Sequence, residues 1–159
     1  MNTRLKLIEM LQAVVDYLKA HQPAPAPVPP VPPTPTPTPI TMKLEDALIM
    51  VESGGNDSAI GDRNLVHMAY GPLQIRQPYV DDVNRKLGTK HRAQDMLNNR
   101  PLSLAIYRAY MGIYATEKRL GRPVTDQDRA RIHNGGPNGW KSPATIGYWS
   151  KVKKFLPAA

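Results

Sequence analysis

Two carboxylates in this sequence have types and spacing that suit catalysis. Glu52 ends an apolar run in "IMVESGGNDSAIGD" (residues 49–62), and Asp62 follows in a polar loop beside Arg63. Apolar neighbours and the negative end of a helix disfavour a charged carboxylate, so we expect Glu52 to hold a proton and Asp62 to stay ionised. Two carboxyl groups in contrasting surroundings are the pattern of glycoside hydrolysis. A plainer interpretation stays open, in which Glu52 is a surface residue and Asp62 a turn residue after Gly61.

A second stretch, "RIHNGGPNGW" (residues 131–140), places His133, Asn134 and Gly135 in a tight turn. Glycine lets backbone amides approach a ligand closely, and the Asn134 amide offers a donor and an acceptor. The alternative is a turn that stops a helix and buries its histidine. The histidines have no metal-ligand spacing, and no cofactor motif is present, so we expect neither a metal nor a cofactor.

The elements that must position these residues are mostly helices. Apolar spacing, capping residues and glycine or proline stops predict helices over residues 41–53, 78–87, 101–121 and 145–155, and another from Thr125 into the turn at 131. Residues 56–76 predict a loop or small hairpin region. With no internal repeat and no alternating βαβ pattern, the fold class is α+β and predominantly helical.

The chain divides into three parts by composition. Residues 1–21 carry an apolar helical stripe that predicts oligomerisation or docking on a partner, with a membrane-surface helix or a frayed tail as alternatives. Residues 22–40 hold ten of the 17 prolines and predict a polyproline linker. Residues 41–159 form the remaining domain, which is long enough to bury a core.

The net charge and the absence of long apolar runs limit the classes of partner that the sequence suggests. The chain of 159 residues has a formal net charge of +8 and no cysteine. A basic protein is attracted to polyanions, but no nucleic-acid motif is present, and no apolar run is long enough for stable membrane insertion. Glu9 and Asp16 interrupt the apolar N-terminal run, so a signal peptide is not evident.

Four ordered blocks resemble the invertebrate-type lysozymes, also called destabilases. They are "VESGG", "AYGPLQIRQPYVDD", "YRAYMGIYAT" and "ARIHNGGPNGWKSPATIGYWSKV", and they span roughly residues 44–155. The resemblance implies a lysozyme-like fold and hydrolysis of the β-1,4 bond between N-acetylmuramic acid and N-acetylglucosamine in peptidoglycan. It implies that Glu52 is the general acid and that Asp62 is the second carboxylate. It also implies that the protein acts on the anionic cell wall, outside the cytoplasm.

The resemblance also predicts which residues line the sugar groove. His133, Asn134 and Gly135 are expected on one wall, and Tyr148 is expected to reach Glu52 or the ligand. The residues expected on the other wall are Tyr70, Gln74 and Ile75.

The sequence departs from this family because the family is dense in disulfides and this chain has none. That difference favours a bacterial or phage-like member, either held in the cytoplasm until release or encoded by a phage. Three alternatives remain open from the sequence. They are a lytic transglycosylase that uses Glu52 alone, a non-catalytic glycan-binding module, and an added isopeptidase activity through His133.

Overall fold

A computed structural model describes residues 42–157, in which helices predominate and one small sheet lies near the start. The α-helices are α2 (Leu44–Ser53), α3 (Gln77–Leu87), α4 (Arg100–Tyr114), α5 (Glu117–Leu120), α6 (Asp126–Gly135) and α7 (Ile146–Val152). Short 3-10 helices lie at Ala93–Met96, Gly139–Lys141, Pro143–Thr145 and Lys153–Phe155. The strands β1 (Ile60–Gly61), β2 (Ala69–Tyr70) and β3 (Ile75–Arg76) form an antiparallel sheet in that order. The predominantly helical α+β class is confirmed.

The predictions for residues 1–21 and 22–40, and for Thr41 as a helix cap, lie outside the described residues. Within the described part, the first helix begins at Leu44, and Lys43 occupies its N-cap position without a capping side-chain bond. No helix among residues 42–157 is both long and apolar enough to span a membrane.

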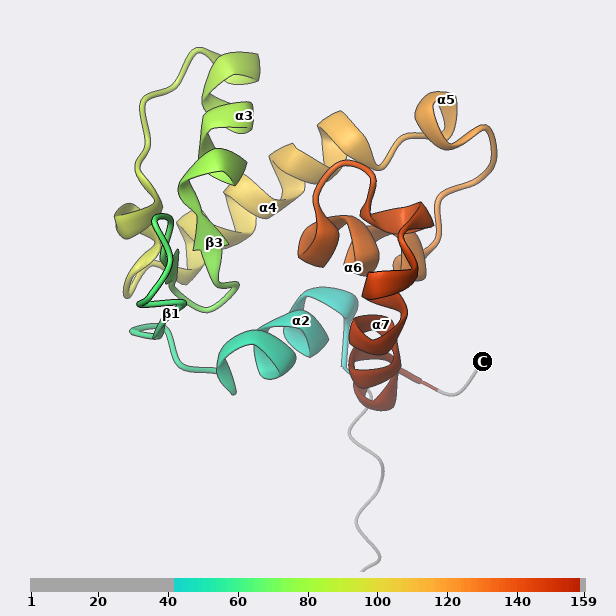
Figure 1. The fold of residues 1–159 in the computed structure, drawn as a ribbon, viewed down its shortest axis with the longest axis horizontal. Helices are drawn as coiled ribbons and strands as arrows, with labels where there is room; N and C mark the ends of the chain where they lie inside the picture. The colour runs from blue at the N-terminus through green and yellow to red at the C-terminus, as the bar shows by residue number, and fades with distance from the viewer. Residues whose placement is uncertain (1–41, 158–159) are drawn as a thin grey trace, which may run out of the picture. The chain divides into compact units, whose positions relative to one another are not determined.

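The sheet and α3 lie on one side of the domain, and α6 and α7 lie on the other (Figure 1). Helix α4 extends between the two sides and packs against both α3 and α6, while α2 packs against α6 and α7. The core at the junction consists of side chains that are at most 1% exposed: Leu48, Leu73, Ile75, Val80, Val83, Met96, Ile132 and Val152. This shared core fixes the two sides relative to each other.

Helix α2 ends where the two glycines predict that it should. Gly54 adopts a left-handed φ of 62°, and its N–H donates to the carbonyl oxygen of Met50. Glycine reaches this conformation at little cost, so the helix stops within two residues of Glu52. The prediction of a stop at Gly54 is confirmed.

The prediction of one continuous helix over residues 101–121 is wrong. Helix α4 ends at Tyr114, and a separate turn of helix, α5, begins at Glu117. The side-chain oxygen of Thr116 accepts a hydrogen bond from the N–H of Arg119 and caps the new helix. A threonine in this position satisfies an amide that a continuing helix would have bonded to a carbonyl, so it breaks the run.

The capping box predicted at Thr125 is confirmed. The Thr125 side chain accepts from the N–H of Asp128, and the Asp128 carboxylate accepts from the N–H of Thr125. Asp128 is 1% exposed and receives two hydrogen bonds of 2.7 Å from the guanidinium of Arg122. The Arg122 hydrogen bonds, opposed by burial, lower the pKa of Asp128 to about 2.

We expect Asp128→Asn to lower the free energy of unfolding at pH 7 by about 1–2 kcal/mol, a value reduced for the solvent screening of Arg122. The contribution of Asp128 is present above its unfolded pKa of about 4 and is lost as the pH falls toward its folded pKa. The difference from wild type in urea unfolding should therefore shrink by about half between pH 7 and pH 3. Asp126→Asn, in the exposed pair with Arg129, is the matched control. A difference for Asp128→Asn that stays constant with pH would contradict this assignment.

Candidate active site

A cleft of ≈ 350 Å³ brings the two candidate carboxylates together. Glu52 enters it from the end of α2, and Asp62 enters it from the loop after β1. The other lining residues come from β3, α3, α4, α6 and their flanks: Gln74, Ile75, Arg76, Pro78, Tyr79, Asp82, Tyr110, His133, Asn134, Gly136 and Pro137. Six of the nine residues in the sequence-based site therefore line one cleft: Glu52, Asp62, Gln74, Ile75, His133 and Asn134.

Glu52 lies in the last turn of α2 and is largely withdrawn from water, with 18% of its side chain exposed. The hydroxyl of Tyr148 donates to Glu52 Oε1 at 2.6 Å, and His133 Nε2 lies 3.6 Å from the same oxygen. Burial, followed by the nearby charge of Glu52, raises the pKa of Tyr148, so its hydroxyl stays protonated. Because that hydroxyl can also accept a hydrogen bond, it can hold Glu52 in either protonation state.

His133 is a neutral neighbour of Glu52 at neutral pH. Burial lowers its pKa, which outweighs the opposing effects of the Glu52 charge and the Leu73 carbonyl. Its ring lies edge-on to Tyr79 and Tyr107, with centroids 5.7 and 5.5 Å away, and Nδ1 is 3.5 Å from the Tyr79 hydroxyl. The distance of 3.6 Å between His133 Nε2 and Glu52 Oε1 is therefore a contact with an uncharged imidazole at neutral pH.

Asp62 has a different environment from Glu52. Its side chain is 39% exposed and forms an ion pair with Arg76 on β3, the strand at the opposite edge of the sheet from β1. Its backbone φ of 52° lies in the left-handed region, where aspartate is found more often than most residues. A Cβ at Gly61 would meet Gln74 Oε1 at 2.2 Å, so any other residue before Asp62 would displace the Gln74 side chain.

Gln74 and Ile75 form the side of the cleft next to Asp62. The side-chain amide nitrogen of Gln74 donates to the carbonyl oxygens of Gly71 (2.8 Å) and Ala59 (3.2 Å). These bonds connect the β2–β3 turn to the residue that precedes β1. Ile75 is only 1% exposed. Both residues therefore support the cleft from the sheet.

Three predicted site residues do not line the cleft. Tyr70 is 6% exposed in β2 and contacts Gln94 through its hydroxyl at 3.4 Å. Gly135 belongs to the last turn of α6 and faces Thr145, whose Cγ2 would lie 2.5 Å from a Cβ at this position. Tyr148 reaches the site through its hydrogen bond to Glu52. The predicted tight turn is also displaced, because His133 and Asn134 remain helical and Gly136 makes the turn.

Several cleft residues were not predicted from the sequence, chief among them Arg76, Tyr79, Asp82 and Tyr110. Tyr79 and Tyr110 stack with ring centroids 3.5 Å apart, which joins α3 to α4 beneath the cleft. The tyrosine spacing within α4 was visible in the sequence, but its partner on α3 was not.

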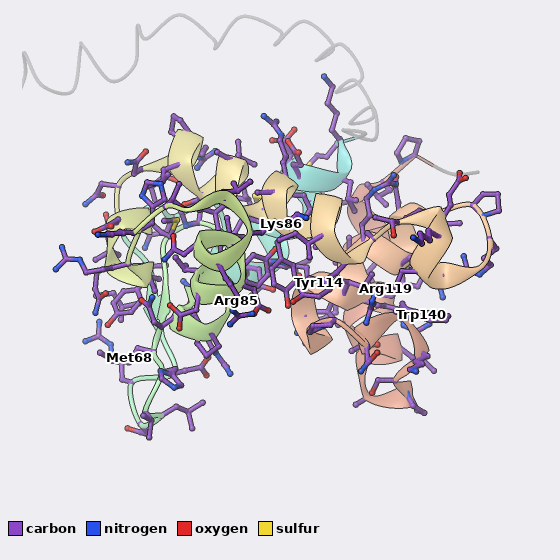
Figure 2. The ribbon with its side chains drawn as sticks, turned by 90° about the horizontal axis from the view of Figure 1, so that it is seen from above. Met68, Arg85, Lys86, Tyr114, Arg119 and Trp140 are labelled. Carbon is purple, nitrogen blue, oxygen red and sulfur yellow. The ribbon has the colours of Figure 1, made fainter. Side chains whose placement is uncertain are left out.

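Asp82 lines one end of the cleft and contacts side chains of α3 and α4. Its carboxylate accepts from the Tyr114 hydroxyl at 2.8 Å and from Arg85 at 2.9 Å. Figure 2 shows Arg85, Tyr114 and Arg119 following one another along this face, from α3 past the end of α4 to α5. Arg119 lies over the Tyr114 ring and donates to the carbonyl oxygen of Pro137, another cleft residue. This network bridges the two sides of the cleft at one end.

Similarity to known proteins was found at the level of both sequence and structure, although no protein-family model matches the chain. An invertebrate-type lysozyme of Ruditapes philippinarum is 33% identical over 117 residues, which cover 73% of this chain and 82% of that protein. A lysozyme of Magallana gigas is 39% identical over 82 residues, which cover 52% of this chain and only 56% of that protein.

Two solved structures share the fold. One is the crystal structure of Tapes japonica lysozyme, with a TM-score of 0.59 and 30% identity, over 75% of this chain and 93% of that chain. The other is the complex of Aeromonas hydrophila PliI with Meretrix lusoria lysozyme, with a TM-score of 0.60 and 27% identity over the same shares.

We expect the His133 imidazole to titrate below 6.5 in the folded protein, because burial disfavours its charged form. Histidine NMR titration measures this pKa, and the urea-unfolded chain is the reference. Because the unfolded state binds this proton more tightly, the protonation of His133 also lowers the free energy of unfolding as the pH falls below about 6.5. A His133 pKa at or above the unfolded value would contradict the assignment.

Proposed function

The chain belongs to the invertebrate-type lysozymes, a family of glycoside hydrolases, and we propose that it is a muramidase of bacterial peptidoglycan. The bond cleaved is the β-1,4 linkage between N-acetylmuramic acid and N-acetylglucosamine. The single observation that carries the proposal is the shared cleft, which holds a largely buried carboxyl group and a half-exposed carboxylate.

In this proposal, Glu52 is the general acid. Its carboxyl group transfers a proton to the bridging oxygen as the bond from that oxygen to the sugar C1 breaks. The neutral His133 does not compete for the proton, and the Tyr148 hydroxyl holds the carboxyl group in one orientation. After the leaving sugar departs, the Glu52 carboxylate takes a proton from the water that attacks C1.

Asp62 is the second carboxylate. It faces the positive charge that develops at C1, either as the nucleophile that forms a glycosyl–enzyme bond or as a charge that stabilises the oxocarbenium ion. Its ion pair with Arg76 and its position on the sheet loop support this role. The two carboxyl groups thus divide the acid and the anionic roles according to their surroundings.

The remaining cleft residues suit a polar sugar. Asn134 is exposed on α6 and offers both a donor and an acceptor to acetamido or hydroxyl groups. Tyr79 and Tyr110 form an aromatic floor, and Gln74 and Ile75 form the sheet side of the cleft. The positive net charge of the chain favours encounter with the anionic wall outside the cytoplasm, an attraction that salt screens.

A lytic transglycosylase is the second candidate, because it also uses a single glutamate acid. The pairing of Asp62 with Arg76 in the same cleft as Glu52 favours hydrolysis, since transglycosylation has no need of a second carboxylate. Hydrolysis leaves reducing ends, whereas transglycosylation leaves anhydromuramyl ends, so mass spectrometry of digested sacculi separates the two.

Glu52→Gln is expected to reduce turbidity loss on purified peptidoglycan by roughly 10²–10⁴-fold, because the proton donor is removed. Asp62→Asn should also reduce it, and the wild-type products should carry reducing ends. Asp57→Asn is the matched control, because Asp57 forms a similar half-exposed pair with Arg100 outside the cleft. Full activity of Asp62→Asn together with anhydromuramyl products would replace hydrolysis with transglycosylation. Undiminished lysis by Glu52→Gln would refute the assigned acid.

Tyr148→Phe should reduce lysis by roughly tenfold while the fold is kept, because Glu52 loses a hydrogen bond worth about 1.5 kcal/mol or more. Tyr70→Phe, which removes a hydroxyl that contacts Gln94 outside the cleft, is the control. Initial rates of lysis measure the effect, and circular dichroism checks the fold. Equal losses in the two variants would show that the Tyr148 hydroxyl has no special role.

A further inference from the structure

A second cavity of ≈ 1100 Å³ opens on the domain and is larger than the catalytic cleft of ≈ 350 Å³. The two share no lining residue. Pockets that bind small molecules usually have volumes of roughly 300–1,000 Å³, so this cavity has room for an extended ligand. It is built from α2, α4, α6 and the C-terminal part of the described chain.

The surface of this cavity is mainly apolar. Its apolar side chains are Met42, Leu44, Met111, Trp149 and Leu156. Four of them are only partly buried although they pack against the core, so they offer apolar surface to a ligand. Burying such surface under an alkyl chain releases roughly 25 cal/mol per Å².

The rim of the cavity carries an excess of positive charge. Arg108 makes two hydrogen bonds to Glu45, of 2.8 and 2.6 Å, and Arg129 pairs with Asp126 at 3.1 Å, so these four charges cancel. Two more cations, Lys43 and Lys153, line the cavity, and neither forms an ion pair within residues 42–157.

The two lysines belong to segments that lie side by side. The backbone N–H of Met42 donates to the carbonyl oxygen of Phe155 at 3.0 Å, which pairs the start of α2 with the 3-10 helix Lys153–Phe155. Lys43 and Lys153 therefore come from adjacent segments of the cavity lining. Two lysines match a phosphate monoester, which carries a charge of about −1.5 to −2 at neutral pH.

A buried hydroxyl without a partner lies at the same cavity. Tyr107 is 3% exposed, and its Oη has no hydrogen-bond partner among the described residues. Burial raises the pKa of Tyr107, and the charges that act on it next are Glu45, Arg129 and Asp126, all on the rim. Because the hydroxyl oxygen is enclosed by protein, a ligand in the cavity would contact the ring of Tyr107 and not its oxygen.

From this combination we propose that the cavity binds a long-chain phosphorylated lipid, with its alkyl chain on the apolar surface and its phosphate at Lys43 and Lys153. The proposal does not depend on the muramidase assignment, because the ligand touches none of the cleft residues. A lipid and a glycan can be held at the same time, so the lipid would add a second attachment at the cell envelope.

The test titrates dodecyl phosphate, below its micelle concentration, into the full-length chain by isothermal calorimetry. We expect saturable binding of one ligand per chain that weakens roughly tenfold for every two methylenes removed from the alkyl chain. Lys43→Gln with Lys153→Gln should weaken it at least tenfold. Lys90→Gln with Lys118→Gln, both exposed and away from both cavities, removes the same charge and should leave binding unchanged.

Three results would overturn the proposal. Equal weakening in the two lysine pairs would show general attraction to a basic protein, and binding independent of chain length would exclude an apolar cavity. Absence of binding, together with a change in sedimentation for Lys43→Gln with Lys153→Gln, would assign the cavity to contacts between copies of the chain. Glu52→Gln should bind dodecyl phosphate as wild type does, so loss of lysis and loss of lipid binding are separable.

Discussion

The hydrogen bond between Tyr148 and Glu52 joins α2 to α7 across 96 positions of sequence, and the candidate site depends on it. A carboxyl group that is 18% exposed has lost most of its hydration, which is unfavourable unless another polar group replaces the water. The Tyr148 hydroxyl is that group. It reaches Glu52 because α7 packs against α2, so the position of Glu52 depends on two helices that are far apart in the sequence.

Asp62, the second candidate carboxylate, is positioned by a loop and an ion pair and not by the packing of helices. Asp62 lies on a loop with a left-handed backbone, and its position depends on the small sheet and on the ion pair with Arg76. Water reaches it, whereas Glu52 meets mainly aromatic rings and a neutral imidazole. The contrast between a largely buried Glu52 and a half-exposed, paired Asp62 is the basis of the different roles proposed for the two groups. Neither environment could be exchanged for the other without moving a strand or a helix.

Features that depend on nearby residues could be predicted from the sequence, and features that depend on distant partners could not. The stop at Gly54 and the capping box at Thr125 are local, and both are confirmed. The break at Thr116 is local too, yet an apolar stripe that continued to Leu120 masked it.

The cleft shows the same division. The sequence brought Glu52 and Asp62 forward as candidates, and the structure places both in one cleft. The pairing of Asp62 with Arg76 and the stacking of Tyr79 on Tyr110 depend on how α3 folds back along the sheet and against α4. Asn134 and Gly135 form the last turn of α6 despite their turn-like composition, because Gly135 packs against Thr145 there.

The large apolar cavity is lined by residues of α2 and α7, the two helices that carry Glu52 and Tyr148. Leu44 at the start of α2 and Trp149 on α7 line the cavity, while Glu52 and Tyr148 on these helices form the hydrogen bond of the candidate site. A chain without cysteine has no disulfide to fix the helices, so their packing must hold the acid in place. A ligand that binds only the folded state adds stability by mass action. Occupation of the cavity would therefore stabilise the folded arrangement of α2 and α7 in which Tyr148 donates to Glu52.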